Sequence, residues 1–205
     1  MKSVFVAISL LCAIAGSVRG NIVIESPFQT NWGQWGSWSR CPFGTYVQAI
    51  QIRTEPYQGA GAYEDDTAVN GIRLYCGDPN NINTAFITSL VGEWGNWGNV
   101  FSCRSDDRPL APDGYVTGFQ LRVEGPLTFG DDTATDNLRI LCNYPNLGIP
   151  EQTKEGDGLN FGSWTDARRC LSNQAVCALQ TQVEPYQGDS DDTAMNNVRM
   201  ECCDR

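Results

Sequence analysis

The stretch DDTAVNGIRLYC, residues 65–76, occurs three times in this chain. It returns as DDTATDNLRILC at residues 131–142 and as DDTAMNNVRMEC at residues 191–202. Each copy has an arginine three residues before its cysteine. Three similar copies in the same order indicate an internal repeat, and repeats of about sixty residues bury a core only by packing against one another.

Two further patterns recur upstream of each copy. The first is aromatic-Gly-x-Trp-x5-Cys, at Trp32 to Cys41, Trp94 to Cys103 and Phe161 to Cys170. The second is Gln-x-x-x-Glu, at Gln51/Glu55, Gln120/Glu124 and Gln180/Glu184. These anchors divide the chain into repeat units of about residues 22–83, 84–146 and 147–204.

The apolar periodicity is that of strands. Apolar and polar residues alternate at residues 50–55, 119–124 and 179–184, and again at 72–76, 138–142 and 198–202. A period of two with one apolar side predicts strands that cover a core on one face. Further short strands are expected at residues 22–25 and 85–91 and near Ile149, and no stretch has helical periodicity. We therefore predict an all-β fold in which three antiparallel sheets form the walls of a triangular prism.

Composition excludes several classes of function. The chain of 205 residues has 14 basic and 24 acidic residues, a formal charge of −10 and no histidine. Without histidine there is no Ser-His-Asp or Cys-His nucleophile, and the commonest zinc ligand is missing. Only two lysines are present, which argues against binding to nucleic acid or to anionic membranes. We expect no cofactor and no metal, and calcium is the weaker alternative because no EF-hand loop occurs.

The first twenty residues resemble a secretory signal. Lys2 precedes an apolar run from Val4 to Ala15 that is interrupted only by Ser9, and small residues follow it. The run is too short to span a bilayer. We expect cleavage between Ser17 and Asn21, no membrane insertion, and a secreted, extracellular, monomeric single domain over residues 21–205.

The cysteines support export. Cys12 lies in the expected signal, and eight cysteines remain, an even number that is typical of a disulfide framework. Equivalent cysteines of a repeat should pair equivalently, which predicts Cys41–Cys76, Cys103–Cys142, Cys170–Cys202 and Cys177–Cys203. The swap of Cys170 and Cys177 between the adjacent Cys202 and Cys203 stays open.

Taken together, the threefold aromatic-Gly-x-Trp, Gln-x-x-x-Glu and Asp-Asp-Thr-Ala…Arg-x-x-Cys motifs and the final cysteine pair resemble the vitelline membrane outer layer protein I family. The resemblance implies a β-prism of three Greek-key sheets and a secreted component of the outer egg coat. It also implies, as an alternative, weak glycosyl transfer on N-acetylchito-oligosaccharides. Two segments depart from the family's pattern, residues 104–113 and residues 60–64.

The repeated carboxylates have two interpretations. The favoured one is structural: Asp and Thr side chains cap a turn before a strand, and the following arginine pairs with an aspartate. The alternative is a carbohydrate site in which two carboxylates flank a sugar, formed from Glu55, Asp66, Glu124, Asp132, Glu184 and Asp192. Because the copies are alike, no residue is assigned as catalytic.

The aromatic residues divide in the same way. Trp35, Trp97 and Trp164 recur and are expected to pack in the core or walls, together with Trp32, Trp94 and Phe161. Trp38 has no counterpart and is the better candidate for an exposed platform that stacks on a sugar. The turns at Tyr57-Gln58-Gly59 and Tyr186-Gln187-Gly188 are further exposed candidates.

Three functions therefore remain. The first is a structural protein of an extracellular coat or matrix, whose partners are other matrix or egg-coat proteins. The second is a carbohydrate-binding module whose partners are glycans, and the third is a weak glycosyl-transferring enzyme. The absence of an asymmetric constellation of acid and base places the enzyme last.

Overall fold

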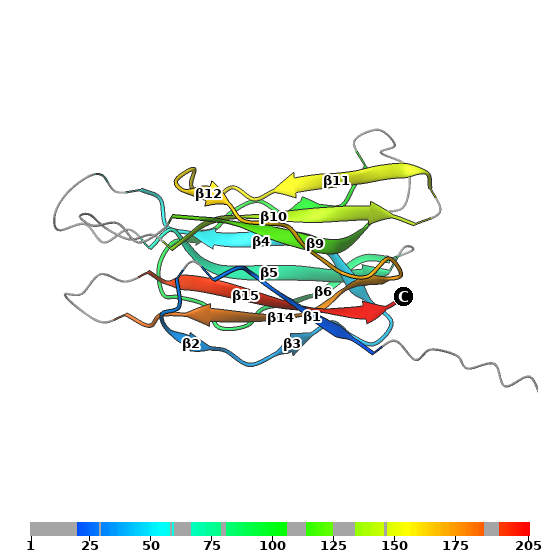
Figure 1. The fold of residues 1–205 in the computed structure, drawn as a ribbon, viewed down its shortest axis with the longest axis horizontal. Helices are drawn as coiled ribbons and strands as arrows, with labels where there is room; N and C mark the ends of the chain where they lie inside the picture. The colour runs from blue at the N-terminus through cyan, green and yellow to red at the C-terminus, as the bar shows by residue number, and fades with distance from the viewer. Residues whose placement is uncertain are drawn as a thin grey trace, which may run out of the picture.

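The computed structural model describes residues 20–28, 30–57, 59, 67–78, 81–105, 114–124, 134–145, 147–186 and 193–205. Within these ranges all regular structure is β-strand (Figure 1), which confirms the all-β prediction. None of the described segments forms a helix with the length and apolar character needed to cross a membrane. The predicted signal and the three Asp-Asp pairs lie outside the described residues.

Each repeat contributes one long antiparallel hairpin. The hairpins are β4 (Tyr46–Thr54) with β5 (Val69–Asp78), β9 (Tyr115–Val123) with β10 (Thr135–Tyr144), and β14 (Gln174–Val183) with β15 (Met195–Asp204). The six strands contain the alternating segments of the sequence, and their apolar positions face one interior. The inward side chains are fully buried, among them Ile52, Leu74, Phe119, Leu121, Ile140, Leu179 and Met200.

The sheets are assembled across the repeats. Sheet I has the order β1 (Ile22–Glu25), β15, β14, β2 (Gln34–Trp35), with β3 (Ser39–Arg40) beside β14. Sheet II has the order β6 (Asn81–Ile87), β5, β4, β7 (Asn96–Trp97), with β8 (Phe101–Ser102) beside β4. Sheet III has the order β11 (Ile149–Glu155), β10, β9, β12 (Ser163–Trp164), with β13 (Arg168–Arg169) beside β9. In sheets II and III the fourth strand of four returns beside the first, which is Greek-key order. Each hairpin thus pairs with three strands of the following repeat, and the last hairpin pairs with the first strands of the chain.

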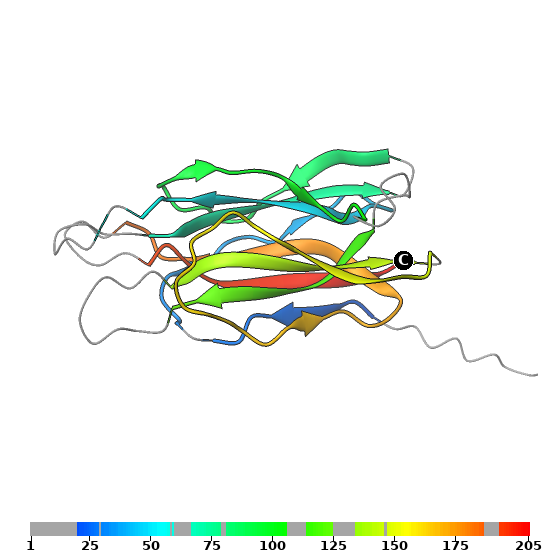
Figure 2. The same cartoon turned by 90° about the horizontal axis from the view of Figure 1, so that it is seen from above.

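The outer strands of the sheets are shorter than the hairpins. Sheet edges are formed by β1 (Ile22–Glu25), β6 (Asn81–Ile87) and β11 (Ile149–Glu155). Six two-residue strands complete the sheets: β2 (Gln34–Trp35), β3 (Ser39–Arg40), β7 (Asn96–Trp97), β8 (Phe101–Ser102), β12 (Ser163–Trp164) and β13 (Arg168–Arg169). Figure 1 shows the blue β1 beside the red β15, so the two ends of the chain close one sheet. Figure 2 shows the strands of all sheets along the long axis of the molecule.

Three disulfides join different sheets. Cys41 follows β3 of sheet I and bonds to Cys76 on β5 of sheet II. Cys103 follows β8 of sheet II and bonds to Cys142 on β10 of sheet III. Cys170 follows β13 of sheet III and bonds to Cys202 on β15 of sheet I. We call these three the corner disulfides, because together they connect every pair of sheets.

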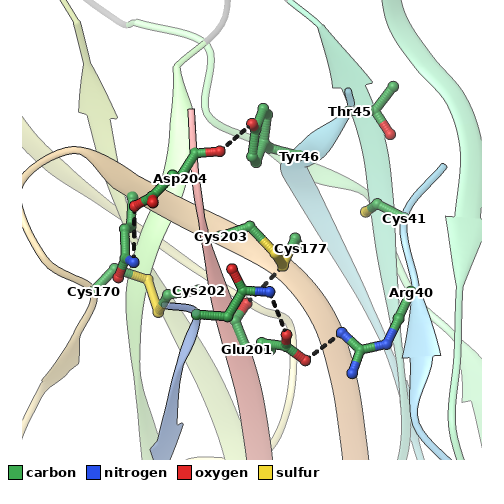
Figure 3. The surroundings of a disulfide bond; sticks show 12 residues. Arg40, Cys41, Thr45, Tyr46, Cys170, Cys177, Glu201, Cys202, Cys203 and Asp204 are labelled. Atoms are coloured by element: carbon green, nitrogen blue, oxygen red, sulfur yellow. Dashed lines mark hydrogen bonds and ion pairs between the residues drawn. A yellow bond between two sulfur atoms is a disulfide. The ribbon is translucent and has the colours of Figure 1, made fainter. Parts of the chain in front are cut away.

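The fourth disulfide, Cys177–Cys203, lies within sheet I (Figure 3). Each hairpin has a register shift on its first strand, which leaves one extra residue: Gln48 in β4, Thr117 in β9 and Cys177 in β14. A β-bulge of this kind re-aims the side chain of the extra residue. Only the third repeat uses the bulge for a cysteine, which explains why this bridge has no counterpart in the other two.

Candidate functional site

The alanine of each Thr-Ala motif makes a left-handed turn of the backbone in front of the second hairpin strand. Ala68, Ala134 and Ala194 have φ angles of 49°, 37° and 46°, a left-handed conformation that is unusual for alanine. Their carbonyls accept hydrogen bonds of 2.8, 3.1 and 2.7 Å from the backbone N–H groups of Glu55, Glu124 and Glu184, respectively. The turn is therefore bound to the end of the first hairpin strand in every repeat.

The glutamate side chains take part in the same turn. The Glu184 carboxylate accepts hydrogen bonds from the hydroxyl of Thr193 at 2.7 Å and from its N–H at 3.3 Å. The amide of Asn196 donates to the Thr193 hydroxyl oxygen at 2.7 Å. Glu55, Thr67 and Asn70 repeat the arrangement in the first unit. The two repeated motifs of the sequence thus meet in one hydrogen-bonded turn.

A second bulge lies two residues after each left-handed alanine. Asn70, Asp136 and Asn196 are the extra residues in β5, β10 and β15, and all three are buried. The second unit thus has a carboxylate where the others have an amide. Because Asp66, Asp132 and Asp192 lie outside the described residues, their predicted role stays a prediction.

The repeated arginines stack on the repeated tryptophans. The guanidinium carbons of Arg73, Arg139 and Arg199 lie 3.9, 4.0 and 3.9 Å from the ring centres of Trp97, Trp164 and Trp35. Such cation–π contacts stabilise both partners. These arginines were expected to pair with aspartates. Among the described residues their carboxylate partners are Glu25 for Arg199 and Glu155 for Arg139. The aspartates lie outside these residues, so their pairing with arginine stays a prediction.

Trp38, the candidate platform, is partly buried. The guanidinium of Arg40 lies 5.8 Å from its ring centre, and Arg40 also forms an ion pair with Glu201 (Figure 3). One ring face thus has a charged neighbour. Trp38 is also less exposed than Trp94 and Tyr186, which lie at the end of the prism where each long hairpin has its loop; we call this the loop end.

A pocket lies at the loop end, between sheets I and II. Trp94 and Tyr186 are 42% and 55% exposed, and their ring centres are 5.8 Å apart at an interplanar angle of 82°. The adjoining cavity of about 170 Å³ is lined by both rings and by Glu93, Glu184 and Asn70. We call this cavity the corner pocket. It combines exposed aromatic rings with polar side chains, and such a combination suits the binding of a polar, ring-shaped ligand.

The neighbouring corner has a related aromatic pair. Tyr57, after β4 of sheet II, lies 5.2 Å from Phe161, before β12 of sheet III, at 64°. The Glu-Pro-Tyr segment of residues 55–57 is identical to that of residues 184–186. The sequence pointed to the two tyrosines as exposed. It did not indicate that Trp94 joins Tyr186, because they belong to different repeats and sheets.

One group of metal-type ligand atoms occurs among the described residues, formed by Cys177, Glu201 and Cys203. The two sulfur atoms are bonded to each other (Figure 3). A metal requires thiolates, so the disulfide removes two of the three ligands. The part of the chain that the structure describes therefore supplies no metal site here.

The arrangement of three sheets around one core defines the class as β-prism proteins. Calystegia sepium agglutinin is similar in structure, with a TM-score of 0.52 and 11% identity over 92% of this chain and 99% of the agglutinin. Single chain recombinant jacalin is also similar, with a TM-score of 0.50 and 9% identity over 92% of this chain and 97% of jacalin. At such identities the likeness shows the fold alone.

Sequence comparison narrows the class. Residues 22–205 match the model of the family described as Vitelline membrane outer layer protein I (VOMI). The human Vitelline membrane outer layer protein 1 homolog is 38% identical over 202 residues, which cover 96% of this chain and 91% of the relative. The mouse homolog is 38% identical over 179 residues, which cover 85% of this chain and 81% of the relative. The chain belongs to the vitelline membrane outer layer protein I family.

Proposed function

We propose that the protein is a secreted structural component of an extracellular coat, in line with the name of its family. The observation that carries the proposal is the set of corner disulfides. Because Cys41–Cys76, Cys103–Cys142 and Cys170–Cys202 each join two different sheets, no sheet can leave the prism without a covalent break. Such bridges persist in oxidising compartments, and a fold held at all three corners suits a layer outside the cell.

The test is to follow the native protein to its layer. An antibody against the folded chain should label an extracellular coat, and mass spectrometry of that coat after washing in high salt should recover peptides of residues 21–205. Retention of the protein inside the producing cells, or its complete release by the salt wash, would contradict a structural role. A chain without its first twenty residues is the control and should stay in the cell.

Carbohydrate binding at the corner pocket is a second candidate function. It is supported by the exposed faces of Trp94 and Tyr186 beside a cavity with two carboxylates. Aromatic faces pack against the C–H face of a sugar ring, while the exposed Glu93 offers a carboxylate at its edge. The fold is shared with lectins and agglutinins, among them a prostate-specific WGA16 glycoprotein lectin at a TM-score of 0.50.

A glycan array on the mature chain, followed by titration of the best ligand, tests this second function. Tyr186→Ala should weaken binding about tenfold or more through loss of the stacking face. Tyr57→Ala is the matched control, since it removes the same residue from the same Glu-Pro-Tyr segment at the other corner. An equal loss in both variants, or no glycan bound by the wild type, would reject the corner pocket as the site.

Catalysis is not proposed. The carboxylates of Glu55 and Glu184 accept hydrogen bonds from the hydroxyl and the N–H of one threonine each, and these contacts account for the recurrence of the glutamate. Incubation of the mature chain with chitin oligosaccharides is the direct check: products of a different length would restore the enzymatic alternative.

A further inference from the structure

Among the described residues, Arg73 differs from its two equivalents because it has no carboxylate partner. Arg199 binds Glu25 at 2.8 and 3.0 Å through Nε and Nη2, and Arg139 binds Glu155 at 2.8 Å. Both glutamates lie on the edge strand of the sheet, opposite the arginine. In sheet II the ladder ends with Leu74 opposite Ile87, and the next residue of that chain segment is Thr88, whose hydroxyl donates to the Ile72 carbonyl at 2.8 Å.

The guanidinium of Arg73 is held by aromatic rings instead. Its central carbon lies 3.9 Å from the ring centre of Trp97 and 4.7 Å from that of Phe86. Its hydrogen bond to Gln51 is long, at 3.5 Å, and its Nε is buried with no hydrogen-bond partner. Within the described chain, therefore, this cation has neither a carboxylate nor a filled N–H edge. An unsatisfied charged donor is costly to bury.

An exposed aromatic surface adjoins this cation. Phe86 is 50% exposed and packs against Tyr75, with ring centres 5.9 Å apart. The register puts Val23 and Thr153 at the positions of Phe86 in the other two sheets. Sheet II alone thus combines an exposed ring with an arginine that lacks its glutamate.

We propose that Arg73 and Phe86 form a site for a single carboxylate or sulfate group carried by a sugar. The acidic group takes the place that the Glu25 carboxylate has on Arg199, where a guanidinium binds two oxygens in parallel. The sugar ring packs on the half-exposed Phe86, and binding requires the neighbouring side chains to shift so that the acidic group reaches the buried Nε. The formal charge of −10 opposes a dense polyanion, so the ligand has isolated acidic groups. The corner pocket plays no part in this site.

The test uses the mature chain and nuclear magnetic resonance of the Trp97 indole and Arg73 Nε signals. Methyl glucuronide and a galactose 6-sulfate, added separately, show which acidic group is preferred, and methyl glucoside is the neutral control. At least one acidic sugar should shift both signals in a saturable way, and the glucoside should shift neither. Equal effects of the acidic sugars and the glucoside would overturn the proposal.

Two substitutions at one position separate binding from folding. Thr88→Glu supplies the missing carboxylate, so it should compete with the ligand and weaken binding at least tenfold. Thr88→Gln loses the same threonine hydroxyl and has nearly the same size without charge, so it should bind within about threefold of the wild type. Equal binding by the two variants would overturn the proposal. Binding of N-acetylglutamate as tight as that of the acidic sugars would overturn its sugar part and assign the site to an acidic protein side chain.

Discussion

Glu184 and Thr193 are joined by two hydrogen bonds, one from the threonine hydroxyl at 2.7 Å and one from its backbone N–H at 3.3 Å. The pair connects the end of β14 to the start of β15 across the loop between them. Glu55 and Thr67 make the same two bonds in the first repeat. A carboxylate that recurs in the sequence is thereby explained by a turn that recurs in the fold.

Removal of the Glu184 carboxylate should destabilise the protein. We expect Glu184→Ala to lower the free energy of unfolding by about 1–3 kcal/mol, because two donors of Thr193 lose a charged acceptor. Urea denaturation of Glu184→Ala, Thr193→Val and the double variant gives the coupling energy, which should be about 1–2 kcal/mol. Glu93→Ala is the control, since Glu93 is an exposed glutamate of the same pocket. A loss as large in the control would contradict the role of the turn.

The left-handed alanines should tolerate glycine and reject branched residues. Ala68 and Ala194 are 1% and 3% exposed and have φ angles of 49° and 46°. Glycine relieves about 1 kcal/mol of backbone strain and loses a similar amount through chain entropy and the missing methyl group, so Ala194→Gly should be nearly neutral. Ala194→Val adds volume at a φ that β-branched residues avoid, and should cost at least about 2 kcal/mol. The measurement is the melting temperature of both variants. Equal values for the glycine and valine variants would contradict a strained backbone at Ala194.

The corner disulfides and the sheet I disulfide should differ in what their removal exposes. The chain-entropy model predicts a similar loss, about 3.5–4 kcal/mol, for Cys41–Cys76 and Cys177–Cys203, whose cysteines are 35 and 26 residues apart. Of these two bridges only Cys41–Cys76 joins two sheets, so its double serine variant should show faster amide exchange in both β3 and β5. The Cys177→Ser/Cys203→Ser variant should keep the slow amide exchange of the wild type in β3 and β5. The same amide exchange rates in β3 and β5 of the two variants would contradict a specific role of Cys41–Cys76 in holding the two sheets together.

Stability should fall above about pH 10 because of Tyr115. Burial raises the pKa of Tyr115 above its ordinary value of 10.0, against the opposing attraction of Arg205. Above pH 10 the unfolded chain releases the tyrosine proton before the folded chain does, so the unfolding free energy decreases as the pH rises. The urea midpoint measured from pH 9 to pH 12 should therefore decline less steeply in Tyr115→Phe than in the wild type. Identical slopes would show that Tyr115 contributes nothing to the decline.

Much of the fold could be predicted from local patterns. The alternation of apolar residues around Ile52, Leu121 and Leu179 predicts strands with one buried face, and these side chains are fully buried. The threefold spacing of cysteines predicts equivalent bridges, and the four disulfides of the structure are the pairs that the repeat suggested first. Both signals depend on residues a few positions apart or on exact repetition, so they are visible in one chain.

The candidate sites were less accessible to sequence reasoning. The absence of a counterpart in the other repeats singles out Trp38 as a candidate site residue. Trp94 belongs to a repeated element, which favours a packing role, yet its side chain is 42% exposed. Exposure of a repeated tryptophan depends on which sheet covers it, and that sheet belongs to another repeat. The tryptophan and glutamate partners of the repeated arginines come from the following repeat or from the chain start, so the spacing within one repeat does not predict them.

The sequence by itself determined that three β-repeats share one core and that disulfides hold them, because period-two alternation and repeated cysteine spacing are local, countable signals. Tertiary structure decided that each sheet combines two repeats and that β1 closes the sheet of β15. It also decided that Arg139 and Arg199 have a glutamate partner, whereas Arg73 has no carboxylate partner in the part of the chain that the structure describes. These features depend on the register between strands far apart in the chain, and register is set by the simultaneous packing of all three sheets on one core.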